Sequence, residues 1–282
     1  MIKNIHSIET GNLRLDGGAM FGVVPKVLWN KVYPADENNQ CNISMRSLLL
    51  DSGDRKILID NGVGDKQDEK FAKNYQLNGE ANLENSLYET GFTREDITDV
   101  IMTHLHFDHC GGAVVEDSES GGFKLAFPNA DYYCSRSQWN NAMHPNRREA
   151  ASYLKENLVP IEESGRLKFI EDNMEDFPGI SFGIFNGHTT GQVIPLIDYN
   201  GKKLVYVSDL IPTCAHVKIP WITAYDIQPL KMLDEKENFL KEARENQYIL
   251  FFEHDIFHEC CTLANGEKGI TVDERFPLET IK

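Results

Sequence analysis

One cluster of side chains constrains this sequence more than any other feature. Asp99–Met102 has the character of a short buried strand and leads directly into Thr103-His104-Leu105-His106-Phe107-Asp108-His109-Cys110-Gly111-Gly112. Neutral imidazole nitrogens and carboxylate oxygens are the ligands that zinc and other borderline divalent ions prefer. A buried cluster of this kind would carry a large desolvation cost with no cation to receive it. The alternative, a solvated histidine-rich loop, fits poorly with the apolar strand before it.

The spacing within the cluster indicates a loop that binds two ions. His-x-His-x-Asp-His is not the pair of histidines four residues apart that one face of a helix offers. A turning loop can instead direct His104 and His106 to one ion, and Asp108 and His109 to a second.

Three later segments place single ligand-type residues after apolar strands. His188 lies in Asn186-Gly187-His188-Thr189-Thr190-Gly191-Gln192, Asp209 follows the strand Lys203–Val207, and His254 follows the strand Tyr248–Phe252. Each is weak evidence alone, but their order after the first cluster resembles the ligand set of the metallo-β-lactamase superfamily. The resemblance spans at least Ile43–Asp255, with Thr190 where the family commonly has proline.

The resemblance implies an α/β fold, an αββα sandwich of two mixed β-sheets flanked by helices. It implies two divalent metal ions, zinc first, with iron or manganese also suited. It assigns His104, His106 and His188 to one ion, Asp108, His109 and His254 to the other, and Asp209 as the bridge between them. Four other histidines match no ligand position, with His258 the main rival of His254: His6, His144, His216 and His258.

The same resemblance implies a hydrolase. Two ions would lower the pKa of a bridging water toward neutrality, and the resulting metal-bound hydroxide would attack the substrate. Asp108 is placed to orient this water or to pass its proton to the leaving group, so Asp108 and Asp209 are the candidate catalytic residues. Asp60 ends the strand Lys56–Asp60, where it would accept a hydrogen bond from a ligand histidine. A plain turn carboxylate is the alternative for Asp60.

A closer resemblance narrows the substrate class to a lactone of the acyl homoserine type or a related ester. A phosphotriester is the alternative, and Tyr225 and Trp221 are the candidate substrate-binding residues. The segments similar to the YtnP-like branch, near the N-acyl homoserine lactonases and the methyl-parathion-hydrolase-type enzymes, are Ser208–Thr213, Ala215–Val217, Pro220-Trp221, Ala224–Asp226 and Phe252–Asp255.

Other functions of the family fit less well. A glyoxalase-II-type thioesterase shares the ligand set but needs a basic site for the glutathione carboxylates, and the sequence shows no clear one. A nuclease needs a basic face, and a flavodiiron-type protein resembles a variant with Glu where His106 stands. A non-catalytic metal-binding protein is the alternative of another class, and such relatives usually lack ligands that are all present here.

Composition restricts the partners to a small-molecule substrate, with a homodimer left open. The 282 residues carry a net charge of -16, which disfavours nucleic-acid phosphates and anionic membrane surfaces. The N-terminus lacks an apolar signal region, and the six cysteines form no Cys-x-x-Cys pair. We therefore expect free thiols in a cytoplasmic protein without a membrane span.

The chain reads as one domain over 1–282, since no repeat or linker interrupts it. The pattern predicts a hairpin over Phe123–Phe127 and Asp131–Cys134, and a loop over Gly17–Gly22. It also predicts a helix over Ser135–Leu158 broken at Pro145. A second predicted helix covers Pro229–Asn246, with Leu230, Leu233, Leu240 and Ala243 on its buried side.

Overall fold

The computed structural model describes residues 1–171, 174, 176–267 and 269–281. Within these residues, two mixed six-stranded sheets, one two-stranded sheet and eight α-helices make up the fold, as the α/β prediction requires. The chain forms two compact units. Unit 1 comprises Met1–Asn12 and Met45–Asp176, and unit 2 comprises Leu13–Ser44 and Phe177–Lys282.

The first sheet, most of which belongs to unit 1, ends in the histidine-rich loop. Its strand β4 lies between β3 and β7, parallel to both, and all three of its residues are buried. A strand covered on both faces reads as a continuous apolar run. Because parallel strands end at the same edge, the segment after β3 meets the segment after β4. In sheet order the strands are β1 (Asn4–Asp16), β2 (Gln40–Asp51), β3 (Lys56–Ile59), β4 (Asp99–Ile101), β7 (Asp131–Ser135) and β8 (Leu167–Ile170).

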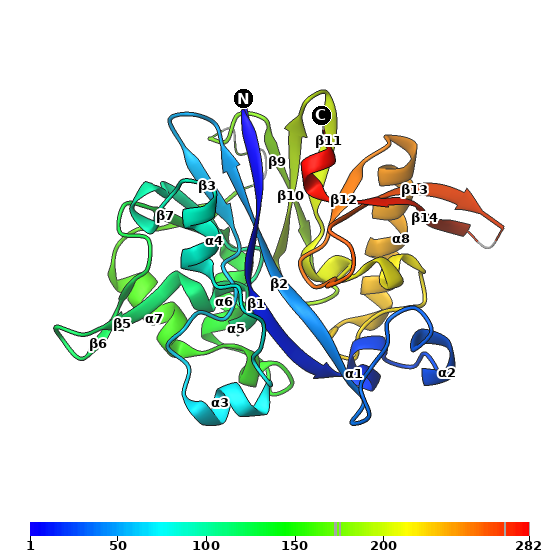
Figure 1. Ribbon diagram of the computed structural model, residues 1–282, viewed down its shortest axis with the longest axis horizontal. Helices are drawn as coiled ribbons and strands as arrows, with labels where there is room; N and C mark the ends of the chain where they lie inside the picture. The colour runs from blue at the N-terminus through cyan, green and yellow to red at the C-terminus, as the bar shows by residue number, and fades with distance from the viewer. Residues whose placement is uncertain (172–173, 175, 268, 282) are drawn as a thin grey trace. The chain divides into compact units, whose positions relative to one another are not determined.

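The second sheet lies in unit 2 and carries the later ligand candidates. Its central strands β11 and β12 are parallel, so the segments that follow them, with Asp209 and His254, leave the sheet at the same edge. In sheet order its strands, which can be followed in Figure 1, are β14 (Gly269–Phe276), β13 (Cys260–Gly266), β12 (Ile249–Phe251), β11 (Lys202–Tyr206), β10 (Gln192–Tyr199) and β9 (Ile180–Phe185).

Two of the local predictions are wrong. Gly17–Gly22 was expected as a loop, but Gly17–Phe21 is the short helix α1, because the Asp16 side chain accepts a hydrogen bond from Ala19 N at 3.0 Å and caps it. The hairpin over Phe123–Phe127 and Asp131–Cys134 does not form. The strand β6 (Gly122–Leu125) instead pairs with β5 (Val114–Asp117), while β7 pairs with β4 and β8. Two neighbouring apolar runs do not by themselves specify their partners.

The helices agree better with the sequence. The first part of the segment Ser135–Leu158 ends before Pro145, as predicted, but helix resumes only at Lys155 and runs past Pro160. The helices are α1 (Gly17–Phe21), α2 (Lys26–Trp29), α3 (Glu69–Asn74), α4 (Leu83–Glu89), α5 (Phe107–Cys110), α6 (Arg136–Met143), α7 (Lys155–Glu163) and α8 (Pro229–Glu245). Short 3-10 turns occur at Arg94–Asp96, Gly111–Ala113, Ala150–Ser152, Ser208–Leu210, Cys214–Val217 and Leu278–Thr280.

Helix α8 covers the second sheet with a face that only partly matches the prediction. Leu240 and Ala243 are buried, but Leu230 at the N-terminus is 77% exposed. Met232, Lys236 and Phe239 complete the buried face in its place. Within the described residues, no helix combines the length and apolar character that crossing a membrane requires. All six cysteines are buried thiols, and none of them is in a disulfide within the described part of the chain.

Candidate metal centre

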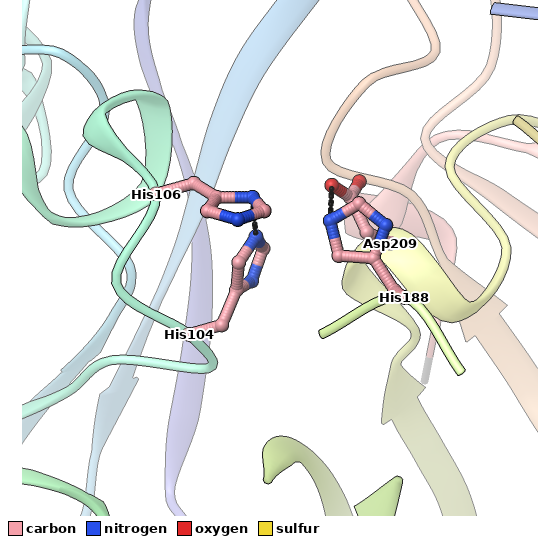
Figure 2. A group of neighbouring side chains, drawn as sticks. All are labelled: His104, His106, His188 and Asp209. Atoms are coloured by element: carbon pink, nitrogen blue, oxygen red, sulfur yellow. Dashed lines mark hydrogen bonds and ion pairs between the residues drawn. The ribbon is translucent and has the colours of Figure 1, made fainter. Parts of the chain in front are cut away.

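His104 and His106 lie side by side in the loop after β4, in unit 1. Both rings are buried, and His104 Nε2 lies 3.1 Å from His106 Nδ1. The dashed line between the two rings in Figure 2 marks this contact. The other nitrogen of His104 lies 3.2 Å from Thr103 Oγ1. The two rings therefore present one nitrogen each to the same point, which is the arrangement that a shared cation requires.

Asp108 and His109 form the second pair of unit 1, on the short helix α5. His109 is fully buried, and its Nε2 lies 3.9 Å from Asp108 Oδ2. His109 Nδ1 lies 3.1 Å from Asp60 Oδ2, and Asp60 also accepts hydrogen bonds from Thr103 N and Thr103 Oγ1, both at 2.7 Å. In the tautomer that donates from Nδ1 to Asp60, the lone pair of His109 is on Nε2, on the side of Asp108.

In unit 2, the carboxylate of Asp209 lies against two histidines. Its Oδ2 is 3.0 Å from His188 Nε2, the pair drawn in Figure 2, and its Oδ1 is 3.1 Å from His254 Nε2. Each oxygen of one carboxylate thus faces a different imidazole. The rival His258 does not take this position: it is half-buried, and its backbone N–H donates to Asp255 Oδ1 at 3.1 Å.

Both of these imidazoles are oriented through their other nitrogen. His188 Nδ1 lies 2.9 Å from Asp226 Oδ1, and His254 Nδ1 lies 2.8 Å from the carbonyl oxygen of Ser44. Asp226 is itself fixed, because its second oxygen accepts a hydrogen bond from Thr223 N at 3.0 Å. No sequence pattern assigns a role to Asp226, and its place in the Ala224–Asp226 segment was the one available signal.

Helix α8 holds the loop that carries His188. The carboxylate of Glu235 accepts hydrogen bonds from the backbone N–H groups of Asn186 and Gly187, at 2.8–3.0 Å. The turn before the helix adds bonds from Gln228 N to the Gly187 carbonyl and from Ile227 N to the His188 carbonyl. The position of His188 therefore depends on a helix more than 40 residues away in sequence.

The charges around His188 favour a cation. Burial disfavours the imidazolium, but the carboxylates of Asp209 and Asp226 outweigh it and raise the pKa of His188 to about 10. His216 behaves in the opposite way. It is buried, lies 2.8 Å from the Met20 carbonyl, and burial lowers its pKa to about 3. His216 is therefore a neutral core histidine, as expected for a residue outside the ligand set.

Another buried carboxylate lies near the first pair. Glu149 is 4% exposed and lies 3.8 Å from His106 Nε2, while its other contacts are with Asn141, Asn146 and Tyr153. Sequence reasoning missed this residue, which lies in an irregular segment with no motif.

The two predicted substrate-binding residues differ in exposure. Trp221 is 8% exposed and packs edge-on against Phe21, whose ring also stacks on Trp29 and His216. Tyr225 is 40% exposed. Trp221 thus belongs to a buried aromatic cluster of unit 2, whereas Tyr225 can meet a molecule from solvent.

A family model described as the metallo-beta-lactamase superfamily matches residues 46–254, most of the chain. The chain belongs to this superfamily. The loop of His104–His109, and the positions of His188, Asp209 and His254, all lie within the matched range.

Three proteins that resemble this chain do so over nearly all of its length. A structure of a probable metal-dependent hydrolase from Staphylococcus aureus is 34% identical, with a TM-score of 0.89, and covers 100% of both chains. An N-acyl homoserine lactonase from Bacillus cereus is 28% identical over 92% of this chain and 95% of its own length. A dizinc quorum-quenching lactonase in complex with a product has a TM-score of 0.78 at 21% identity, over 98% and 97% of the two chains. These likenesses confirm the predicted metallo-β-lactamase fold.

Proposed function

We propose that the protein is a metal-dependent hydrolase that binds two divalent ions and opens a lactone of the N-acyl homoserine type or a related ester. One observation carries the proposal: Asp209 turns one carboxylate oxygen toward each of two imidazoles, His188 and His254, at 3.0 and 3.1 Å. A carboxylate in this disposition can bridge two metal ions, with one oxygen and one histidine directed to each ion.

The donor set fits two ions. His104 and His106 form one ready pair, and Asp108 and His109 form the other. Of the histidines, those at 109, 188 and 254 hold their Nδ1 against an oxygen, which leaves Nε2 as the ligand atom. We assign His104, His106 and His188 to the first ion, Asp108, His109 and His254 to the second, and Asp209 to both. Histidine and carboxylate ligands suit zinc, and also iron or manganese.

The chain's own side chains have distinct tasks in this reaction. When bound, the ions lower the pKa of a water toward neutrality and polarise the substrate's carbonyl oxygen. The Asp108 carboxylate is 14% exposed and would accept a proton from the attacking water and pass it to the leaving alkoxide. Asp60 and Asp226 keep the rings of His109 and His188 in one orientation and one tautomer. We place Tyr225 beside the substrate because its ring is exposed, and keep Trp221 as the packing behind it.

The lactone is preferred because the similarity to the Bacillus cereus N-acyl homoserine lactonase extends over nearly the full length of both chains. Aryl esters and phosphotriesters need the same attack and the same stabilisation of a developing oxyanion, so they form the arms of the test. The single domain over 1–282, the cytoplasmic location and a homodimer remain predictions.

The test is metal analysis of the purified protein, followed by hydrolysis of N-acyl homoserine lactones, aryl esters and phosphotriesters. We expect about two metal ions per chain and the highest kcat/KM on a lactone. Asp209→Ala should lose metal and activity by orders of magnitude, whereas His258→Ala should keep both. An Asp209→Ala protein with full metal content and full turnover would contradict the assignment. If the protein prefers a phosphotriester, the proposed metal centre would stand, but the proposed lactone substrate would be wrong.

A further inference from the structure

A cavity lies in unit 1, lined in part by the loop that follows β3. It has a volume of about 280 Å³, and Thr10, Asn61, Asp65, Glu84, Arg94 and Gly112 are among the residues that line it. It is at the small end of the range of ligand pockets. None of the proposed metal ligands lines it.

Asn61 is the buried polar group of this cavity. The residue is 0% exposed, and neither its amide nitrogen nor its amide oxygen has a hydrogen-bond partner among the described residues. The backbone of Asn61 is fixed, since its N–H donates to the His109 carbonyl at 2.9 Å. The close approach of Gly112, where an added Cβ would lie 2.1 Å from Asn61 O, fixes it further. A buried amide without partners raises the free energy of the folded protein, so a partner that enters the cavity would remove this cost.

Arg94 supplies a positive charge to the same cavity. Its side chain is 18% exposed, and its ion pair with Asp65 is 3.9 Å long, with Asp65 itself 71% exposed. This separation exceeds a hydrogen bond, so Asp65 does not use the N–H donors of the guanidinium. A guanidinium recognises a carboxylate through two parallel hydrogen bonds.

The acidic residues of the lining determine which carboxylate-containing ligands the cavity can accept. Asp65 and Glu84 are exposed acidic residues of the lining, which disfavour a ligand with two negative charges and attract a ligand's ammonium group. A neutral amide, a guanidinium and two carboxylates together match a zwitterion. We propose that this cavity binds a small free amino acid. Its carboxylate contacts Arg94 and the Asn61 amide nitrogen, and its ammonium group faces Glu84 and Asp65.

The test uses the whole protein and is independent of the metal-dependent reaction. A panel of the standard L-amino acids at about 10 mM is screened for a rise in the thermal unfolding midpoint, and isothermal titration calorimetry then measures the Kd of those that raise it. n-Butyrate and n-butylamine serve as probes with one charge each. We expect at least one amino acid to bind saturably, and both single-charge probes to bind at least tenfold more weakly.

Two variants locate the binding. Arg94→Met keeps the packing of the stem and should raise the Kd at least tenfold. Arg166→Met removes an arginine with a similar 3.9 Å ion pair, to Asp131, away from the cavity, and should leave the Kd unchanged. Asn61→Leu should abolish binding while keeping the unfolding midpoint, because an apolar side chain of similar size replaces an unsatisfied amide. Absence of binding by every amino acid, equal affinity for n-butyrate, or an unchanged Kd in both Arg94→Met and Asn61→Leu would overturn the proposal.

Discussion

Asp226 shows how one residue outside the ligand set can control a metal ligand. Its carboxylate accepts from His188 Nδ1 at 2.9 Å and is held by Thr223 N. We predict that Asp226→Asn lowers metal affinity by about 10–100-fold, because a neutral amide holds the ring less firmly and makes it a weaker ligand. Competition with a chromogenic chelator measures the affinity. Asp234→Asn, which changes an exposed carboxylate on α8, is the control. Equal affinities of the two variants would remove Asp226 from this role.

Lys236 is another single residue with a marked effect, because its amino group is buried. It is 1% exposed and donates to the carbonyls of Lys218, Ile219 and Trp221 at 2.7–3.4 Å. Burial lowers its pKa from 10.5 to about 7, against the opposing attraction of Asp226. Between these pH values the unfolded chain holds a proton that the folded protein has lost. The free energy of unfolding therefore rises with pH across this window, and the gain is lost as the pH falls from 10.5 to about 7.

Lys236→Met tests this pH dependence. The variant lacks the titrating group, so its stability should not share that rise, which amounts to about 1.4 kcal/mol for each pH unit. Urea unfolding of both proteins at pH 7 and pH 9 gives the difference directly, since all other groups titrate in both. Parallel stability profiles would show that the ammonium keeps its ordinary pKa by bonding to the three carbonyls.

Much of the candidate site could be read from the sequence because ligand chemistry is local. The residue types and spacing of His104–His109 predict a metal-binding loop before any fold is known. Asp226, Glu149 and Glu235 could not be found in this way. Each reaches its partner through tertiary packing, and an Asp or Glu in a loop or on a helix surface carries no pattern of its own. Lys236 was missed because periodicity assigns buried helix positions to apolar residues only.

At the scale of elements, helix α8 determines where the His188 loop lies. The Glu235 carboxylate accepts hydrogen bonds from the loop's N–H groups. Gly187 approaches the helix so closely that an added Cβ would lie 2.4 Å from Met232 Cα. Backbone atoms cannot yield without moving the helix. We predict that Gly187→Ala destabilises the protein by about 1–3 kcal/mol and also lowers metal affinity, since His188 moves with the loop.

The control for this prediction is Gly122→Ala. An added Cβ at Gly122 would meet only Ser120 Oγ, at 3.5 Å, so stability should change little. Chemical denaturation gives the free energy of unfolding, and chelator competition gives the metal affinity. If Gly187→Ala unfolds at the same denaturant concentration as Gly122→Ala, the close packing of the loop on α8 is not required.

Helices and strands were predictable where a sequence pattern covers the whole element. The strand β3 and the helix α8 follow from an apolar run and from helical period. The pairing of β5 with β6 and of β7 with β4 did not follow, because the partner of a strand depends on contacts distant in sequence. The parallel pairing of β3 with β4 is the most consequential case, since it brings Asp60 to the edge where Thr103 and His109 lie.

At the scale of the whole molecule, the proposed ligands are distributed over residues 104–254 and follow strands of both sheets. Ions that bind only the folded chain add their binding free energy to its stability, about 2.7 kcal/mol when the free ion is at a hundred times its Kd. We therefore predict that chelation lowers the Tm and that zinc restores it. Asp209→Ala should show a much smaller difference between loaded and chelated protein, because the carboxylate that serves both ions is gone. Calorimetric scans of loaded, chelated and reconstituted protein measure this. Metal analysis must first show that chelation has removed the ions. If the Tm is then unchanged, the fold is complete without the metals, and they serve the chemistry alone.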